Sequence, residues 1–176
     1  LITMALSKKE KEILKSIVVA SENDPNKPEF PPDNPKFPAT PTYKIEVPGF
    51  SNIWLKDESK NLTGTHKDRM AWEMVVTYKE FLISKMEGRI SKLPILSILS
   101  SGSAALAIQT QLKKYNLPNL HVLMDSSTDN KVVKGLKKIG CNIFLKDLGR
   151  KILAWDDILK LTDNEDGFDI TSNEAY

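Results

Sequence analysis

The chain has 176 residues, enough for one domain with a full hydrophobic core. Its 25 Lys and Arg residues nearly balance 23 Asp and Glu residues, so the net charge of +2 lacks the concentrated positive charge of a nucleic-acid binder. No apolar run approaches the roughly 18 residues of a membrane span, and no secretory signal is recognisable. We therefore expect a cytoplasmic protein with neither a nucleic-acid nor a membrane partner.

The first 50 residues are predicted to form an N-terminal helix and a proline-rich arm. The segment Ser7–Glu10 has the pattern of a capping box, and apolar residues then recur at helical spacing to about Ala20. Eight of the ten prolines lie between Pro25 and Pro48, where they favour extended chain. Because three aromatic residues also lie in this stretch, we expect an ordered arm packed across a larger body rather than a simple linker. They are Phe30, Phe37 and Tyr43.

Residues 51–162 are predicted to form one lobe in which strands and helices alternate. The apolar patterns predict strands at 53–57, 95–99, 120–124 and 142–145. They predict helices at 67–86, 103–115, 129–139 and 150–161. Such alternation is typical of an α/β fold with three layers, a parallel sheet covered by helices on both faces. The acidic segment 163–169 is expected to be a surface loop, and 163–176 a connector toward a second lobe.

Ligands of such sheets bind beyond the carboxyl ends of the strands, which directs attention to two loops. The first, 58–67, ends at Lys67, which would open a helix directly after a loop containing Gly64. The positive end of a helix disfavours a cation and so favours the neutral amine, which can attack an aldehyde. The alternative is an exposed lysine that is merely tolerated at a helix start.

The second loop is Ser100-Ser101-Gly102-Ser103, between a predicted strand and a predicted helix. Small residues allow a ligand close to the backbone, and hydroxyl groups with free N–H groups suit a carboxylate or a phosphate. The alternative is that Ser103 only caps the helix. The sequence has no dinucleotide-binding or P-loop glycine motif and no G-x-S-x-G motif.

Other reactive or charged residues are expected to be structural. Cys141 is the only cysteine, which excludes an internal disulfide, and it is expected to be a buried small hydrophobic residue. With His66 and His121 as the only histidines, no metal site is expected. Four lysines on one predicted helix are expected to form a solvated face, namely Lys131, Lys134, Lys137 and Lys138.

In their order along the chain, these motifs resemble the pyridoxal-phosphate enzymes of fold type II. This family includes tryptophan synthase β-subunit, threonine synthase, cysteine synthase and the serine/threonine dehydratases. Its pattern is a Thr-Pro pair, a strand, a Pro-Thr-Gly-Ser loop before the cofactor lysine, and a Ser/Thr-Ser-Gly-Asn loop. The resemblance runs from Thr40 to Cys141, and the matching segments are Thr40–Tyr43, Ile53–Ser59, Asn61–Arg69 and Ser100–Ser103.

The resemblance implies pyridoxal phosphate as cofactor, with Lys67 as its Schiff-base lysine and as the base that moves the Cα proton. His66 and Ser103 would contact the cofactor. The substrate α-carboxylate would be bound by Ser100, Ser101 and Gly102. The implied function is that of the N-terminal portion of an amino-acid lyase or synthase that catalyses β- or γ-elimination or replacement.

Two departures from the family pattern shape the alternatives. Ser103 stands where the family has an asparagine that meets the cofactor. Family members are also roughly twice as long, and their glycine-rich phosphate loop would lie downstream of this sequence. We therefore expect an incomplete fold, weak cofactor binding, and a homo-oligomer or a complementary chain. The alternative function is a non-catalytic descendant that acts as a binding or interaction module.

Overall fold

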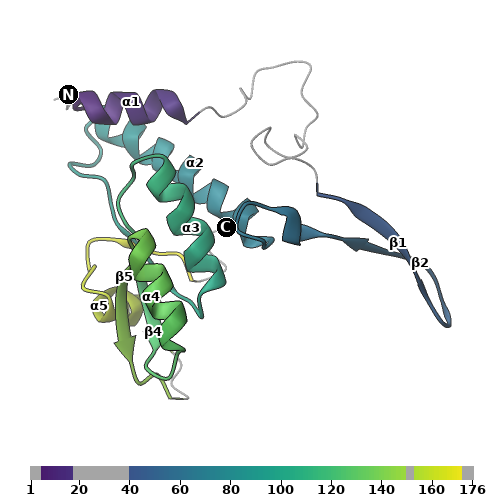
Figure 1. Ribbon diagram of the computed structural model, residues 1–176. Coiled ribbons are helices and arrows are strands. Elements are labelled where there is room, and N and C mark those ends of the chain that lie inside the picture. Colours follow the sequence, from purple (N-terminus) through teal and green to yellow (C-terminus); the bar gives the residue numbers. More distant parts are fainter. Residues whose placement is uncertain (1–4, 18–39, 150–152, 172–176) are drawn as a thin grey trace.

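The computed structural model describes residues 5–17, 40–149 and 153–171 (Figure 1). Its helices are α1 (Lys8–Ser16), η1 (Glu58–Lys60, a 3-10 helix), α2 (Lys67–Met86), α3 (Ser103–Lys114), α4 (Asn130–Ile139) and α5 (Trp155–Leu161). Its strands are β1 (Thr42–Val47), β2 (Phe50–Lys56), β3 (Leu96–Leu99), β4 (His121–Asp125), β5 (Asn142–Lys146) and β6 (Phe168–Asp169).

Four of these strands form a parallel sheet in the order β5-β4-β3-β6. Helices flank this sheet, which confirms the predicted α/β fold. From β3 the chain adds β4 and then β5 on one side, and it returns to add β6 on the other side of β3. The strand order therefore reverses at β3, and such a reversal is where ligands bind in open parallel sheets.

The remaining two strands form a separate antiparallel hairpin. β1 and β2 pair from Thr42 with Lys56 to Val47 with Phe50, and Gly49 in the connecting turn has a φ of 83°. The predicted strand 53–57 is thus present, but it pairs with the arm and not with the parallel sheet. The hairpin extends away from the helices (Figure 1), and Tyr43 in β1 is exposed rather than packed on a larger body. Phe30 and Phe37 lie outside the described residues.

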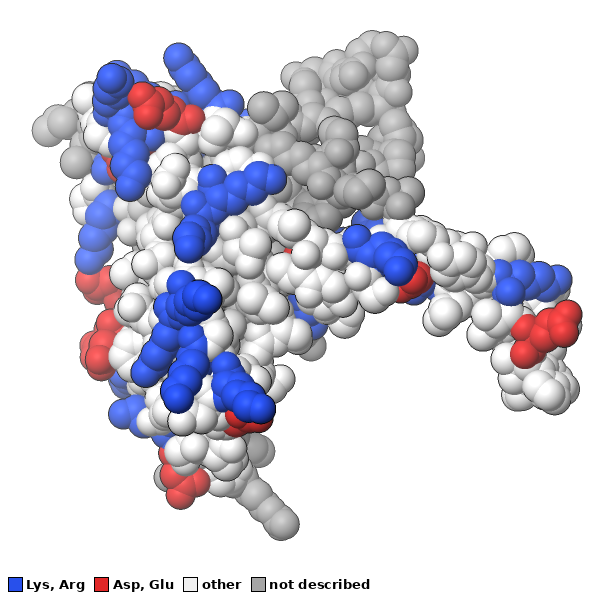
Figure 2. All heavy atoms as spheres, in the orientation of Figure 1, with Lys and Arg blue, Asp and Glu red and all other residues white. Residues whose placement is uncertain are grey.

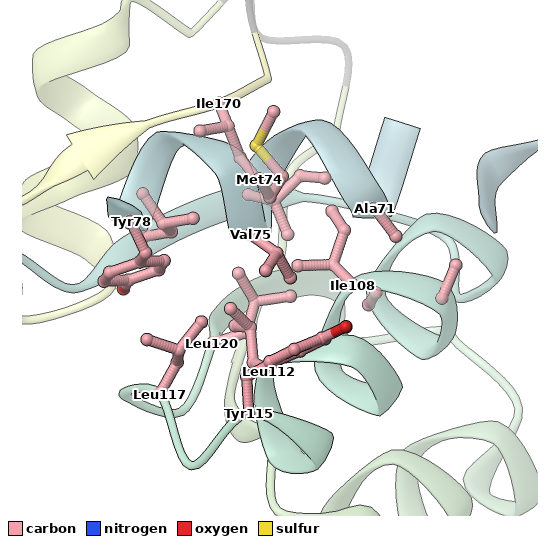
Figure 3. Packing of buried hydrophobic residues seen from close by; sticks show 14 of the residues in the cluster. Ala71, Met74, Val75, Tyr78, Ile108, Leu112, Tyr115, Leu117, Leu120 and Ile170 are labelled. Carbon is pink, nitrogen blue, oxygen red and sulfur yellow. The ribbon is translucent and has the colours of Figure 1, made fainter. Parts of the chain in front are cut away.

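The hydrophobic core lies mainly where α2 and α3 pack against the sheet (Figure 3). Residues at helical spacing on α2 are completely buried, among them Ala71, Val75, Tyr78 and Leu82. The Tyr78 hydroxyl donates a hydrogen bond to the Pro94 carbonyl at 2.8 Å, so this aromatic ring is buried without an unsatisfied polar group. This packing fixes the position of α2, and hence of the loop before it.

Most observed element ends agree closely with the sequence patterns, but α1 ends at Ser16 instead of near Ala20 and β2 begins at Phe50 instead of residue 53. α2 begins and ends where predicted, whereas the last helix begins at Trp155 instead of residue 150. The segment predicted to be a surface loop contains β6, because the Phe168 and Ile170 N–H groups donate to the carbonyls of Ile95 and Ser97. Among the described residues, no helix is long and apolar enough to span a membrane.

Candidate functional site

Lys67 is the first residue of α2, as predicted, and its side chain is half-buried. Its backbone N–H donates to Thr65 Oγ1 at 3.3 Å. Within the part of the chain that the structure describes, no hydrogen bond or ion pair engages its amine. His66 precedes it as the N-cap, exposed and without a side-chain capping bond. No described residue therefore occupies the amine at the start of α2.

The Glu58 carboxylate connects three segments around this lysine. It accepts hydrogen bonds from Arg69 Nε at 2.9 Å, Thr40 Oγ1 at 2.6 Å and Asn61 Nδ2 at 2.7 Å. The Arg69 guanidinium, followed by the Thr40 hydroxyl, lowers the pKa of Glu58 from 4.5 to about 2. The carboxylate is thus charged at neutral pH and joins the start of the hairpin, the 58–67 loop and the first turn of α2.

A second carboxylate, Asp68, holds the middle of the same loop. It is completely buried, and its Oδ2 accepts hydrogen bonds from the Thr63 N–H at 2.9 Å and the Thr63 Oγ1 at 2.8 Å. An acidic residue in the first turn of a helix is also favoured by the positive helix end. Gly64, the residue after Thr63, has a φ of 79°, a backbone conformation that favours glycine. The loop before Lys67 is therefore fixed by side-chain hydrogen bonds to the Glu58 and Asp68 carboxylates.

The Ser100–Ser103 loop follows β3 at the point where the strand order reverses. Gly102, not Ser103, is the N-cap of α3, so the alternative in which Ser103 merely caps the helix is wrong. The Gly102 N–H donates to Ser100 Oγ at 3.1 Å, and the side chains of Ser101 and Ser103 are exposed. Exposed hydroxyl groups therefore lie beside the N-terminus of α3, which carries partial positive charge.

Glycine is required at position 102. Its φ is 139°, and a Cβ atom added there would lie 2.9 Å from Val132 Cγ1 on α4. A hollow of about 320 Å³ adjoins this loop between α3 and α4. It is lined by Ser101, Gly102, Ser103, Leu106, Val132, Gly135 and Leu136.

Two residues near this loop were missed by the sequence analysis. The Thr171 hydroxyl accepts a hydrogen bond from the Leu99 N–H at 2.8 Å and so supports the end of β3. Asp169, opposite Ser97 in the register of β6 with β3, accepts from the Thr171 N–H at 3.0 Å, whereas its buried Oδ2 has no hydrogen-bond partner among the described atoms. No signal in the sequence marked them, since both lie in the segment predicted to be a loop and connector.

The two predicted loops stand on different elements. α2 and α3 pack together, but within the described residues no hydrogen bond joins Lys67 or His66 to the Ser100–Ser103 loop. Away from the site, Cys141 is buried as predicted, and burial raises the pKa of its thiol to about 12. The four lysines of α4 are exposed, as predicted, and the face of the molecule that carries α4 is basic (Figure 2).

Comparison with known families identifies this arrangement. A family model described as "Pyridoxal-phosphate dependent enzyme" matches residues 36–164. The chain belongs to this family. The match covers both loops, confirms the resemblance seen in the sequence, and gives pyridoxal phosphate as the cofactor of the family. No curated protein matches the sequence.

Solved structures show the same fold at low sequence identity. O-ureido-L-serine synthase has a TM-score of 0.55 at 19% identity and covers 74% of this chain. A hydrogen sulfide-producing enzyme from Fusobacterium nucleatum has a TM-score of 0.55 at 23% identity and covers 77%. A pyridoxal 5'-phosphate-dependent aspartate racemase has a TM-score of 0.56 at 17% identity and covers 77%. This chain spans only 40%, 42% and 40% of these structures, respectively.

Proposed function

We propose that this chain forms the N-terminal portion of a pyridoxal-phosphate-dependent amino-acid lyase or synthase and that Lys67 binds the cofactor through its amine. The observation that supports this proposal most strongly is the position of Lys67, in a chain that belongs to the pyridoxal-phosphate-dependent enzyme family. It is the first residue of α2, half-buried, with an amine that is unengaged by the described residues. The preceding loop is fixed by Glu58 and Asp68.

The residues of the second loop fit the anionic groups of the cofactor and of an amino-acid substrate. The loop offers three features that suit a carboxylate. They are its hydroxyl groups, a glycine without a side chain to obstruct the backbone N–H groups, and the positive end of the 12-residue helix α3. We assign the substrate α-carboxylate to Ser100, Ser101 and Gly102. The cofactor contacts are assigned to His66 and Ser103.

The reaction class follows from the chemistry that these residues perform. When bound, pyridoxal phosphate supplies an electron sink for the electron pair left at the substrate Cα. Lys67 would hold the cofactor through Nζ, and its amine, when free, would move the proton at the substrate Cα. The serine loop holds the carboxylate while the proton moves. These roles are compatible with β- or γ-elimination or replacement on an amino acid, which is the reaction class that we propose.

A titration with pyridoxal phosphate, followed by the absorption of the bound cofactor, tests the proposal. Wild-type chain is expected to bind weakly but saturably, whereas Lys67→Arg, which keeps the positive charge but loses the reactive amine, is expected not to bind saturably. Lys60→Arg is the matched control, because Lys60 is an exposed lysine of the same loop. Equal binding by wild type and Lys67→Arg would contradict the proposal.

The alternative function is a non-catalytic binding module that retains the fold. The observation that favours it is Ser103, a shorter residue than the asparagine of the family pattern and exposed at the start of α3. A module of this kind would not bind pyridoxal phosphate saturably. Absence of saturable binding by the wild-type chain would therefore favour the module over the enzyme.

A further inference from the structure

Two neighbouring strands of the parallel sheet, β3 and β6, end at the same edge. The chain leaves β3 into the Ser100–Ser103 loop and adds β4 on one side, whereas β6 lies on the other side of β3. β3 and β6 pair in parallel, with Ser97 opposite Asp169. Ligands of such sheets bind in the crevice beyond the carboxyl ends of the strands, where the strand order reverses. The residues that follow β6 therefore lie beside the Ser100–Ser103 loop.

Thr171, two residues beyond β6, is bonded to the last residue of β3. Its Oγ1 accepts a hydrogen bond from the Leu99 N–H at 2.8 Å, and Leu99 directly precedes Ser100. On the other side of β3, the Ser100 N–H donates to the Leu123 carbonyl of β4 at 3.1 Å. The end of β3 is thus held between β4 and the Thr171 side chain, and the Thr171 hydroxyl lies at the start of the Ser100–Ser103 loop.

The backbone on which Thr171 stands is held as well. The Thr171 N–H donates to Asp169 Oδ1 at 3.0 Å, and the Ile170 N–H donates to the Ser97 carbonyl at 2.9 Å. Ile170 is buried in the hydrophobic core, whereas Thr171 is only half-buried. A residue that is anchored in this way, yet not enclosed, presents its side chain to a ligand in a defined position.

The Thr171 hydroxyl keeps its donor hydrogen unpaired within the described residues. A hydroxyl group has one donor hydrogen and two acceptor positions. The oxygen accepts from the Leu99 N–H, and the described part of the chain offers no acceptor to the hydrogen. A donor of this kind, beside a loop of further hydroxyl groups, suits a negatively charged group of a ligand.

We propose that Thr171 is a further substrate-binding residue, whose hydroxyl donates a hydrogen bond to the α-carboxylate bound by the Ser100–Ser103 loop. This inference rests on the proposed function, which assigns that carboxylate to Ser100, Ser101 and Gly102. Thr171 adds a donor from a second strand, so the carboxylate is held from both β3 and β6. Because donors on two elements fix the direction of the carboxylate as well as its charge, they also orient the substrate.

Two ligands that differ only in the carboxylate test this proposal. L-Serine and ethanolamine share an amine and a hydroxyl group, but ethanolamine has no carboxylate. Each is titrated into the chain with pyridoxal phosphate bound, and the change in cofactor absorption is corrected for the reaction of free cofactor with the same amine. Thr171→Val keeps the shape of the side chain and removes the hydroxyl, so its affinity for L-serine is expected to fall at least about tenfold. Its affinity for ethanolamine is expected to equal that of wild type.

Three further variants serve as controls. Thr171→Ser retains the hydroxyl and should bind L-serine nearly as well as wild type. Thr110→Val on α3 should bind both ligands as wild type does, because Thr110 is also half-buried but donates its hydroxyl hydrogen to the Leu106 carbonyl, at 2.7 Å. Thr171→Asp keeps an oxygen that can accept from the Leu99 N–H and adds a negative charge, so it should bind L-serine more weakly than Thr171→Val.

The results that would overturn the proposal are distinguishable. A wild-type chain that does not bind pyridoxal phosphate saturably would overturn both this inference and the proposed function. Saturable cofactor binding with an unchanged affinity of Thr171→Val for L-serine would overturn this inference alone. So would an equal loss of affinity for L-serine and ethanolamine, which would show a disturbed fold. Wild-type affinity of Thr171→Asp for L-serine would show that the side chain only holds the end of β3, and would also overturn it.

Discussion

The loop before Lys67 and the loop after β3 are positioned in opposite ways. Side chains hold the first: Glu58 and Asp68 together accept hydrogen bonds from Thr40, Asn61, Thr63 and Arg69. The second has one internal hydrogen bond, from the Gly102 N–H to Ser100 Oγ, and a glycine pressed close to α4. In the function we propose, its exposed hydroxyl groups bind the ligand.

This difference separates two tasks. A lysine that must meet a reactive carbon needs a defined position, which a network of charged hydrogen bonds can supply without a ligand. A loop that binds a carboxylate needs free hydrogen-bond donors. Donors that already bond to side chains of the protein could not bind the carboxylate. Substitutions of the hydrogen-bonded side chains in the first loop should therefore change stability, and substitutions of the serines in the second should change ligand binding. Gly102 is an exception in the second loop, because its backbone conformation and its contact with Val132 bear on stability.

The largest effect on stability is expected from Gly102→Ala. The backbone conformation at Gly102 strains any other residue, and the new Cβ would force Val132 to move, so we expect a loss of about 1–3 kcal/mol in the free energy of unfolding. Urea unfolding measures this loss. Gly135→Ala in α4 is the control, because it has open space around its Cβ and should gain about 0.5–1 kcal/mol. Equal stability of the two variants would show that the loop is not tightly held.

Thr63→Val is expected to have the next largest effect. It keeps the shape of the side chain but removes the hydroxyl donor to the buried Asp68 carboxylate, at a cost of about 1–2 kcal/mol in the free energy of unfolding. Thr63→Ser retains the hydroxyl and should remain close to wild type. If both variants unfold at the same urea concentration, the hydrogen bond to Asp68 does not hold the loop.

A pH dependence is expected from Glu58. Its folded-state pKa is lowered to about 2 from 4.5, so its contribution is fully present above pH 4.5 and is lost as the pH falls toward 2. Glu58→Gln removes this titration. The difference in unfolding midpoint between wild type and Glu58→Gln should therefore shrink over this range. A difference that is independent of pH would contradict the role given to the Arg69 ion pair.

The smallest effect is expected from Lys60→Ala. Lys60 is exposed and lies 3.9 Å from Asp57, and an exposed ion pair at this distance contributes little. The unfolding midpoint and the binding of pyridoxal phosphate should both stay at their wild-type values. A marked loss of either would show that the charge of the loop, rather than Lys67 itself, governs the site.

The sequence predicted elements whose signal is local. α2 was predicted with both ends correct, because a long apolar period, Lys67 after a glycine loop and Gly88 beyond its end all agree. The pairing of β2 was not predicted, since the apolar pattern of a short strand does not identify its partner. β6 was missed because a strand of two residues is too short to show an alternating apolar pattern. Its place beside β3 depends on hydrogen bonds to Ile95 and Ser97.

The same distinction applies to the site. Lys67 and the serine loop were found because each is a short motif at an element boundary. The Glu58 network was not foreseen, because its donor Thr40 is 18 residues away and Arg69 is 11 residues away. Contacts of this range form only once the fold has brought the segments together.

The attachment of pyridoxal phosphate to Lys67 is tested most directly by borohydride reduction followed by peptide mapping. Reduction makes any bond between the cofactor and a lysine permanent, so the labelled residue can be identified. At limiting pyridoxal phosphate we expect the label to lie at Lys67 and at no other lysine, and we expect no single dominant adduct in Lys67→Arg. Label spread over exposed lysines such as Lys134 and Lys138, with none at Lys67, would contradict the proposed role of this residue.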